Sequence, residues 1–166
     1  MQVGYIDALG NARDNKLQPY GKKILDTNGN ILFESDEELF DKIHTGCSIS
    51  TKWKDFLSQL VFEGSEGNLY LTNKRMIFIN NIDPRSKFSG GFGIPSSIVR
   101  MAKARELKTR GVKEYFEVKL DEIAGVNLRK DGLLSIQLLV GMEKYHISVY
   151  PSERVIECLE KLPFDK

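Results

Sequence analysis

The charges that could carry chemistry are concentrated in one stretch of the chain. Residues 86–113 hold seven basic side chains and one acidic one, which gives a formal charge of +6, so the rest of the 166-residue chain must carry −5 for a total of +1. Lysine and arginine bind phosphate and carboxylate groups, so this stretch predicts contact with an anionic surface. The residues expected to make that contact are Arg100, Lys103, Arg105, Lys108 and Arg110, with Phe92 as an apolar side chain that enters the interface.

Two shorter groups add cations beside this stretch. Lys52 and Lys54 flank Trp53, and Lys74 and Arg75 form a basic pair between two β-rich runs. Trp53 begins an i, i+3, i+4, i+7 stripe, which predicts an amphipathic helix that either closes one end of the fold or touches lipid or a partner. The stripe contains Trp53, Phe56, Leu57 and Leu60. For Lys74 and Arg75 the alternative to ligand binding is simple solvation of a turn.

The remaining reactive side chains do not form a catalytic or metal-binding pattern. Cys47 and Cys158 are far apart, and His44 and His146 lack the spacing of metal ligands. The glycine-rich stretch at residues 88–95 matches no nucleotide-binding motif. Helix capping and exposed turns account for the acidic residues, which are Asp36, Glu37, Glu38, Asp121 and Glu122. We therefore expect no enzyme activity, no cofactor and no metal.

Most of the elements that position these residues are predicted to be strands. Residues 69–72 and 76–79 are β-rich runs that flank a polar turn at Asn73, and the residues after 113 alternate between apolar and polar side chains several times. The expected strands lie near 46–50, 67–73, 75–80, 115–121, 123–129, 133–140 and 144–150. A final helix is expected near 152–162, where one stripe contains Val155, Cys158, Leu159 and Leu162.

Residues 67–79, with the sequence GNLYLTNKRMIFI, resemble the signature of GRAM domains and the related bacterial and archaeal PH-like domains. Residues 118–123 and the Cys-Ser-Ile segment at 47–49 add to the likeness. The resemblance implies a mainly β fold with helices, in which a partly open, seven-stranded barrel of two antiparallel sheets is capped by a C-terminal helix. It covers roughly residues 38–162.

The part of the chain before this barrel is expected to be an addition. Residues 1–21 lack periodicity and predict a mobile N-terminal arm. Residues 22–45 predict a hairpin that turns at Asn28-Gly29, followed by a short helix that a capping box at 35–38 would open. Residues 46–166 then form the PH-like domain, with a basic insertion at 85–113 that is either a contact surface or a solvated loop.

The resemblance implies a binding module. Family members that bind phosphoinositides place basic residues around the first loop and the strand after it, but here residues 68–72 contain no lysine or arginine. We therefore expect a non-enzymatic adaptor that binds an anionic membrane surface or a partner protein, with nucleic-acid binding through residues 87–113 as the alternative. No apolar run reaches the ~20 residues of a membrane span, so the expected location is the cytoplasm or the surface of a membrane.

Overall fold

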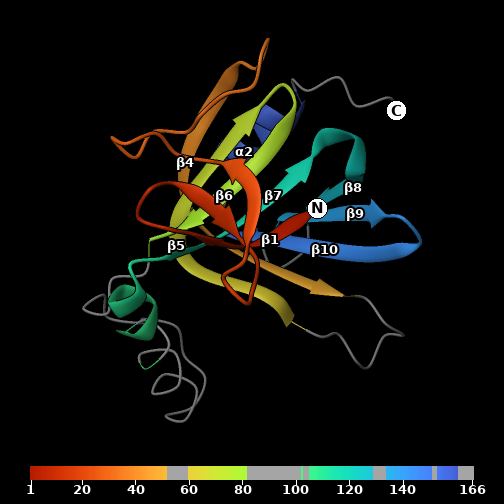
Figure 1. Cartoon of the computed structure of the whole chain (residues 1–166). Helices are drawn as coiled ribbons and strands as arrows, with labels where there is room; N and C mark the ends of the chain where they lie inside the picture. The colour runs from red at the N-terminus through yellow and green to blue at the C-terminus, as the bar shows by residue number, and fades with distance from the viewer. Residues whose placement is uncertain (52–59, 82–101, 103–104, 129–133, 151–152, 161–166) are drawn as a thin grey trace.

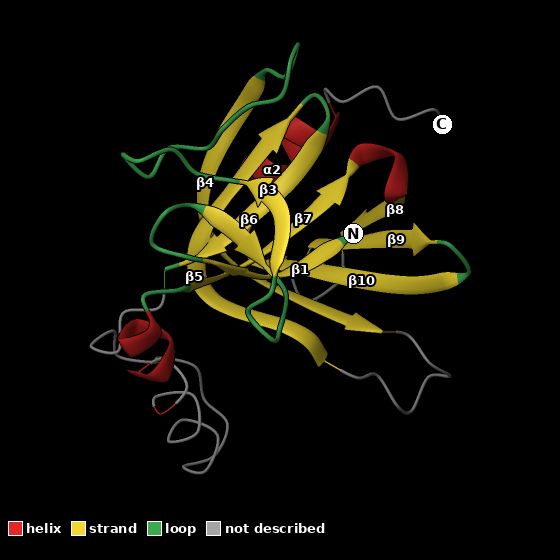
Figure 2. Cartoon of the chain, viewed as in Figure 1, coloured by secondary structure: helices red, strands yellow, loops and turns green. Residues whose placement is uncertain are grey.

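Ten strands form one continuous antiparallel sheet in this computed structural model, which describes residues 1–51, 60–81, 102, 105–128, 134–150 and 153–160 (Figure 1). The order across the sheet is β3-β2-β1-β7-β6-β5-β4-β10-β9-β8. Helices make up a small part of these described residues (Figure 2). The elements are β1 (Gln2–Ile6), β2 (Asn11–Arg13), β3 (Pro19–Lys23), β4 (Leu39–Thr51), β5 (Leu60–Thr72), β6 (Arg75–Asn80), β7 (Lys113–Lys119), the 3-10 helix η1 (Leu120–Glu122), β8 (Ile123–Leu128), β9 (Leu134–Val140), β10 (Glu143–Tyr150) and α2 (Glu153–Glu160).

The predicted fold class is confirmed by the way these strands connect. β4 to β7 form one antiparallel meander and β8 to β10 form a second, and the two join where β10 pairs with β4. A C-terminal helix follows, and it places Val155 and Cys158 in the core between the two meanders. The seven strands therefore build a PH-like, partly open barrel with a C-terminal helix.

β4 is the strand that joins the two halves of the barrel. Residues 39–45 pair with β5, whereas residues 47–50 pair with both β5 and β10. The register between β4 and β5 shifts at three places, and such bulges let a long strand bend. The bent sheet encloses an apolar core, in which Phe62, Phe78 and Phe116 lie together with ring centroids 5.3–5.8 Å apart.

Gly67, the small residue that opens the signature sequence, is required by close packing. A Cβ atom at this position would lie 2.3 Å from the carbonyl oxygen of Ile79 and 2.5 Å from the ring of Phe78. Neither neighbour can move away cheaply, because Ile79 is paired in the sheet and Phe78 is fully buried. A glycine here lets β5 approach β6 directly under the aromatic core.

The prediction of a mobile N-terminal arm is wrong for the strands within it. β1 pairs with β7 along its whole length, from Gln2 opposite Glu117 to Ile6 opposite Lys113. Ile6 and Ala12 are buried in a second apolar cluster on the outer face of β5, β6 and β7. Residues 76–79 are apolar at every position, so both faces of β6 need a cover, and the N-terminal segment supplies the outer one.

The predicted short helix within residues 35–46 is also wrong, because β4 already begins at Leu39. From Ile43 to Ile49 the odd positions are buried and the even ones are more exposed, which is the two-residue period of a strand. The side chain of Glu37, expected near the start of that helix, instead binds Arg75. The turn predicted at Asn28-Gly29 is present, with Leu25 bridging to Ile31 across it.

One helical segment follows the last strand of the barrel and another precedes β7. α2 covers most of the expected range 152–162, and Arg154 in it forms an ion pair with Asp41 of β4 at 3.1 Å. Residues 105–110 are helical and end at Gly111, which has a φ of +64°, a left-handed conformation that glycine readily adopts after the end of a helix. Among the described residues, no helix is long and apolar enough to cross a membrane.

Candidate functional site

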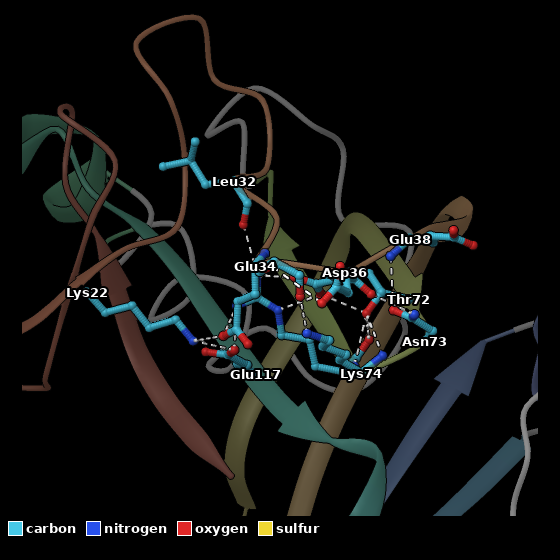
Figure 3. A network of polar contacts seen from close by, with 12 residues as sticks. Lys22, Leu32, Glu34, Asp36, Glu38, Thr72, Asn73, Lys74 and Glu117 are labelled. Carbon is cyan, nitrogen blue, oxygen red and sulfur yellow. Dashed lines mark hydrogen bonds and ion pairs between the residues drawn. The ribbon is translucent and has the colours of Figure 1, made fainter.

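Arg75 is buried and lies at the centre of a network of polar contacts. Figure 3 shows this network from close by, with Leu32, Thr72 and Glu117 among its labelled residues. Its Nε and Nη2 atoms donate to the two carboxylate oxygens of Glu37 at 2.7 and 2.8 Å. Nη1 donates to Glu117 on β7 at 2.7 Å, and Nη2 also donates to the carbonyl oxygen of Leu32 at 2.9 Å. The guanidinium therefore joins β6 and β7 to the segment that precedes β4.

The charges in this network stabilise one another. Burial alone would lower the pKa of Arg75, but its bonds to Glu37 and Glu117 outweigh burial and raise that pKa. Burial likewise acts to raise the pKa of Glu37, and the bonds from Arg75, the Glu34 amide and the Thr72 hydroxyl lower it on balance. Glu37 and Arg75 therefore both remain ionised at neutral pH.

The other residues of the signature turn hold the loop that precedes β4. The Asn73 side chain accepts from the amide of Glu38 at 2.9 Å and donates to the carbonyl oxygen of Asp36 at 3.0 Å. The ammonium group of Lys74 donates to the carbonyl oxygen of Ser35. Thr72 donates to Glu37 at 2.7 Å. The Thr-Asn-Lys-Arg sequence thus fixes residues 32–38, which we call the anchored loop.

The expected role of Arg75 in ligand contact is therefore wrong, because its donors are occupied and its side chain is 3% exposed. Lys74 is exposed, but its ammonium group already binds the anchored loop. The alternative prediction, that Arg75 is simply solvated at the turn, is also wrong, because its side chain is buried and bound to Glu37 and Glu117. Lys22, which was not among the predicted residues, extends the network through an ion pair with Glu117 at 2.6 Å.

The basic side chains in the described part of the segment 86–113 are exposed, whereas Leu107 and Val112 are buried. Arg105, Lys108 and Arg110 project from the helical residues before Gly111, and Arg110 forms an ion pair with Glu106 at 2.7 Å. Lys113 at the start of β7 is exposed as well. The other predicted contact residues lie outside the described part of the chain, and they are Lys52, Trp53, Lys54, Phe92, Arg100 and Lys103.

The basic helical residues and the anchored loop lie at opposite ends of the barrel. β6 and β7 are antiparallel, with Arg75 opposite Lys119 at one end and Ile79 opposite Tyr115 at the other. The helical residues enter β7 at the Tyr115 end, whereas the anchored loop is fixed at the Arg75 end. Figure 1 shows this separation, with the loop before β4 at the top and the green helical turn at the lower left.

Exposed apolar side chains flank the acidic residues of the anchored loop. Leu32 and Phe33 are 38% and 46% exposed, and Leu39 and Phe40 just after the loop are 44% and 42% exposed. Glu34, Asp36 and Glu38 between them are also exposed. This end of the molecule therefore offers apolar and acidic groups on a backbone that its hydrogen bonds hold in one conformation.

Cys47 and His44 lie in surroundings that do not suggest a catalytic or metal-binding role. Burial raises the pKa of the Cys47 thiol well above its usual range, which keeps it protonated. His44 is exposed and lies 3.0 Å from the carboxylate of Glu66. In the described ranges, no group of three or more His, Cys, Asp or Glu side chains could hold a metal ion.

Comparisons with known proteins add one structural likeness. No protein-family model matches the chain, and no curated protein matches it in sequence. One solved structure, a Vps36 N-terminal PH domain, aligns with a TM-score of 0.44 and 14% identity, covering 82% of this chain and 84% of that one. The strand order gives the fold as PH-like, and GRAM membership stays a prediction from residues 67–79.

Proposed function

We propose that this chain is a non-enzymatic, PH-like binding module that attaches to anionic membrane surfaces through its basic end. The observation that carries the proposal is the exposure of Arg105, Lys108, Arg110 and Lys113 at the end of the barrel where β7 begins. Residues 86–113, which contain them, have a formal charge of +6. Lysine and arginine near an anionic leaflet attract its headgroups without needing a shaped pocket.

The exposed carboxylates at the anchored-loop end of the barrel support one orientation of the module on a membrane. Glu34, Asp36 and Glu38 of the anchored loop are exposed there, and Asp121 follows the end of β7. An anionic surface repels these carboxylates while it attracts the cations at the other end. The basic end therefore faces the membrane and the anchored loop faces away from it.

The expected binding is weak and depends on salt. Each lysine or arginine near the surface contributes about 1 kcal/mol, and the ion pair between Arg110 and Glu106 reduces the share of Arg110. Because Arg75 and Lys74 are committed to the anchored loop, the signature hairpin adds no comparable set of donors. Headgroup charge, rather than the stereochemistry of one inositol phosphate, is therefore the feature recognised.

Co-sedimentation with phosphatidylserine vesicles tests the proposal. Wild type is expected to sediment at low salt and to dissociate as salt rises, whereas Arg105→Glu with Lys108→Glu weakens binding about tenfold or more, at ~1 kcal/mol for each charge removed. The matched control, Lys119→Glu with Lys144→Glu, changes the net charge equally away from the basic end and should bind like wild type. Equal loss in both variants, or no sedimentation of wild type, contradicts the proposal. Binding to duplex DNA but not to vesicles would favour the nucleic-acid alternative.

A partner protein is a second candidate, favoured by the exposed apolar side chains around the anchored loop. Such side chains on a fixed backbone lose little conformational entropy when they bind. Affinity purification from the source cells can compare wild type with Phe33→Ser/Phe40→Ser and with Leu9→Ser as a control at another exposed apolar site. A protein recovered by wild type and the control, but lost with the double variant, supports this candidate. Equal recovery by all three removes it.

A further inference from the structure

A buried polar pair lies inside the barrel at its basic end. Asn80 is the last residue of β6 and Glu114 is the second residue of β7, and each is two positions from a buried phenylalanine of the core, Phe78 or Phe116. Since side chains alternate along a strand, both polar side chains lie on the same inner face as those phenylalanines. Asn80 is 2% exposed and Glu114 is 7% exposed. The Nδ2 atom of Asn80 donates to Glu114 Oε2 at 3.0 Å, which joins the ends of the two strands.

The hydrogen bonding of Asn80 is incomplete. Its amide is oriented by the bond to Glu114, because an ionised carboxylate can accept but not donate. The Oδ1 atom is then left as an acceptor, and in the part of the chain that the structure describes it has no donor. A buried acceptor without a donor has lost its bonds to water and has formed none to replace them. A group that brings a donor to this position would therefore be bound favourably.

The chemistry of this pair selects the kind of donor. An ammonium group has several N–H donors and a positive charge, so it can donate to Asn80 Oδ1 while the Glu114 carboxylate attracts it. A carboxylate has about four lone-pair sites, so Glu114 can accept from such a group in addition to Asn80. A phosphate, by contrast, is repelled by the negative charge of Glu114. The pair therefore suits a cationic nitrogen and disfavours an anion.

Cations that suit an anion lie at the same end of β7. Lys113 directly precedes Glu114 and is exposed, and Arg105 and Lys108 project from the helical residues that lead into the strand. A ligand that meets both sets of groups must carry a phosphate and an ammonium group. Phosphatidylserine is an anionic lipid of this kind, whereas phosphatidylglycerol has the same net charge and no ammonium group.

We propose that Asn80 and Glu114 form a subsite for the ammonium group of an aminophospholipid headgroup, whose phosphate binds the cations beside them. This inference rests on the proposed membrane contact and adds a chemical preference to it. The exposed cations attract any anionic leaflet, and the buried pair then distinguishes headgroups that carry an ammonium group from those that do not. A water molecule is the alternative donor for Asn80 Oδ1, and it would give no such preference.

Vesicles of matched charge test this preference. Wild type should bind phosphatidylserine vesicles about tenfold more tightly than phosphatidylglycerol vesicles of equal mole fraction, which is the effect of roughly one hydrogen bond to a charged group. Asn80→Leu and Glu114→Gln should each bind both kinds of vesicle alike, because the exposed cations remain. Tyr115→Phe is the control, since its hydroxyl is the other buried side-chain atom without a partner in the described residues but lies on the outer face. This control should keep the preference.

A titration followed by NMR locates the ligand without any substitution. The side-chain amide signals of Asn80 in wild type should shift with soluble phosphoserine, which carries phosphate and ammonium groups, and stay unchanged with glycerol phosphate. An Asn80 signal that phosphoserine does not move overturns the subsite. Equal binding of wild type to the two kinds of vesicle, or a preference that survives both variants of the buried pair, overturns it as well but leaves the membrane contact standing. Failure to sediment with either vesicle contradicts the membrane contact and the subsite together.

Discussion

The two faces of the β5–β6–β7 sheet are both buried, but different interactions bury them. The inner face packs mainly apolar side chains into the barrel, including the aromatic cluster of Phe62, Phe78 and Phe116, and its polar pair is the buried hydrogen bond from Asn80 to Glu114 near one end. The outer face is covered by the N-terminal segment, with apolar contacts of Ile77 and Ile79 toward one end and the Arg75 network at the other. The inner face closes the barrel, whereas the outer face attaches a second layer to it.

This difference predicts how each face responds to change. Apolar packing loses stability in proportion to the volume removed, so one truncation affects one site. A buried ionic network depends on all of its members, because removing one charge leaves its partners unpaired in a medium of low dielectric constant. Removing one charge from the network should therefore destabilise the whole outer layer, whereas truncating one core side chain should destabilise only its own site.

The largest expected effect is that of removing the outer layer. Deletion of residues 1–21 removes β1 from the edge of β7 and uncovers Ile79 and Tyr115. Loss of the buried Ile6 and Ala12 side chains and of the strand pairing should cost at least ~5 kcal/mol, much of the stability of a typical domain. Thermal unfolding and chain solubility measure this. Unfolding at the wild-type temperature would mean that the outer layer contributes nothing to the barrel.

Arg75→Ala and Phe116→Ala should each cost ~3–5 kcal/mol, but for different reasons. The first leaves the Glu37 and Glu117 carboxylates buried without a cation, and the second leaves a cavity. Changing all three charged residues together, as Arg75→Met/Glu37→Leu/Glu117→Met, should recover most of the loss, because no buried charge remains. Chemical denaturation compares the three proteins. If the triple variant is no more stable than Arg75→Ala, the network stabilises the fold through the geometry of its hydrogen bonds, and not merely by neutralising buried charges.

Acid should loosen the outer layer before the inner core. Hydrogen bonds from Asn11 and Arg13 outweigh the effect of burial and lower the pKa of Asp7 to about 2, and the pKa of Glu37 is also lowered. A depressed carboxylate pKa gives stability above the unfolded-state value, 3.8 for Asp7 and 4.5 for Glu37, and this stability is lost as pH falls through the folded-state value. Amide exchange in β1 should therefore accelerate between pH 4.5 and about 2 while β9 stays protected. Simultaneous loss in both strands would contradict the separation of the two layers.

The sequence predicted the barrel but not its cover, for reasons that particular residues make clear. Strands β6 to β10 alternate or are fully apolar over short runs, so local pattern locates them. The N-terminal segment lacks such a pattern, because three short strands and two turns contribute only a few buried side chains. The signal for a cover was present in residues 76–79, where four successive apolar residues require burial on both faces.

The same reasoning applies to the candidate site. A basic pair in a turn is usually solvated, and Lys74 is exposed as that expectation requires. Arg75 begins the strand that is buried on both faces, so it had to be buried and paired. Its partners Glu37 and Glu117 lie 38 and 42 residues away in the sequence, and no spacing rule connects them. By contrast, the exposed cations at 105, 108 and 110 were predictable from composition alone.

The smallest expected effect comes from the rim of the network. Lys22 is about one-third exposed and forms an ion pair with Glu117 at 2.6 Å, but Arg75 still neutralises that carboxylate when Lys22 is absent. Lys22→Met should therefore cost only ~0.5–1 kcal/mol, the usual range for an exposed pair, and high salt should reduce the difference. Lys23→Met, at the exposed neighbouring position, is the matched control and should be neutral. A loss as large as that of Arg75→Ala would mean that Lys22, rather than Arg75, carries the charge balance of the outer face.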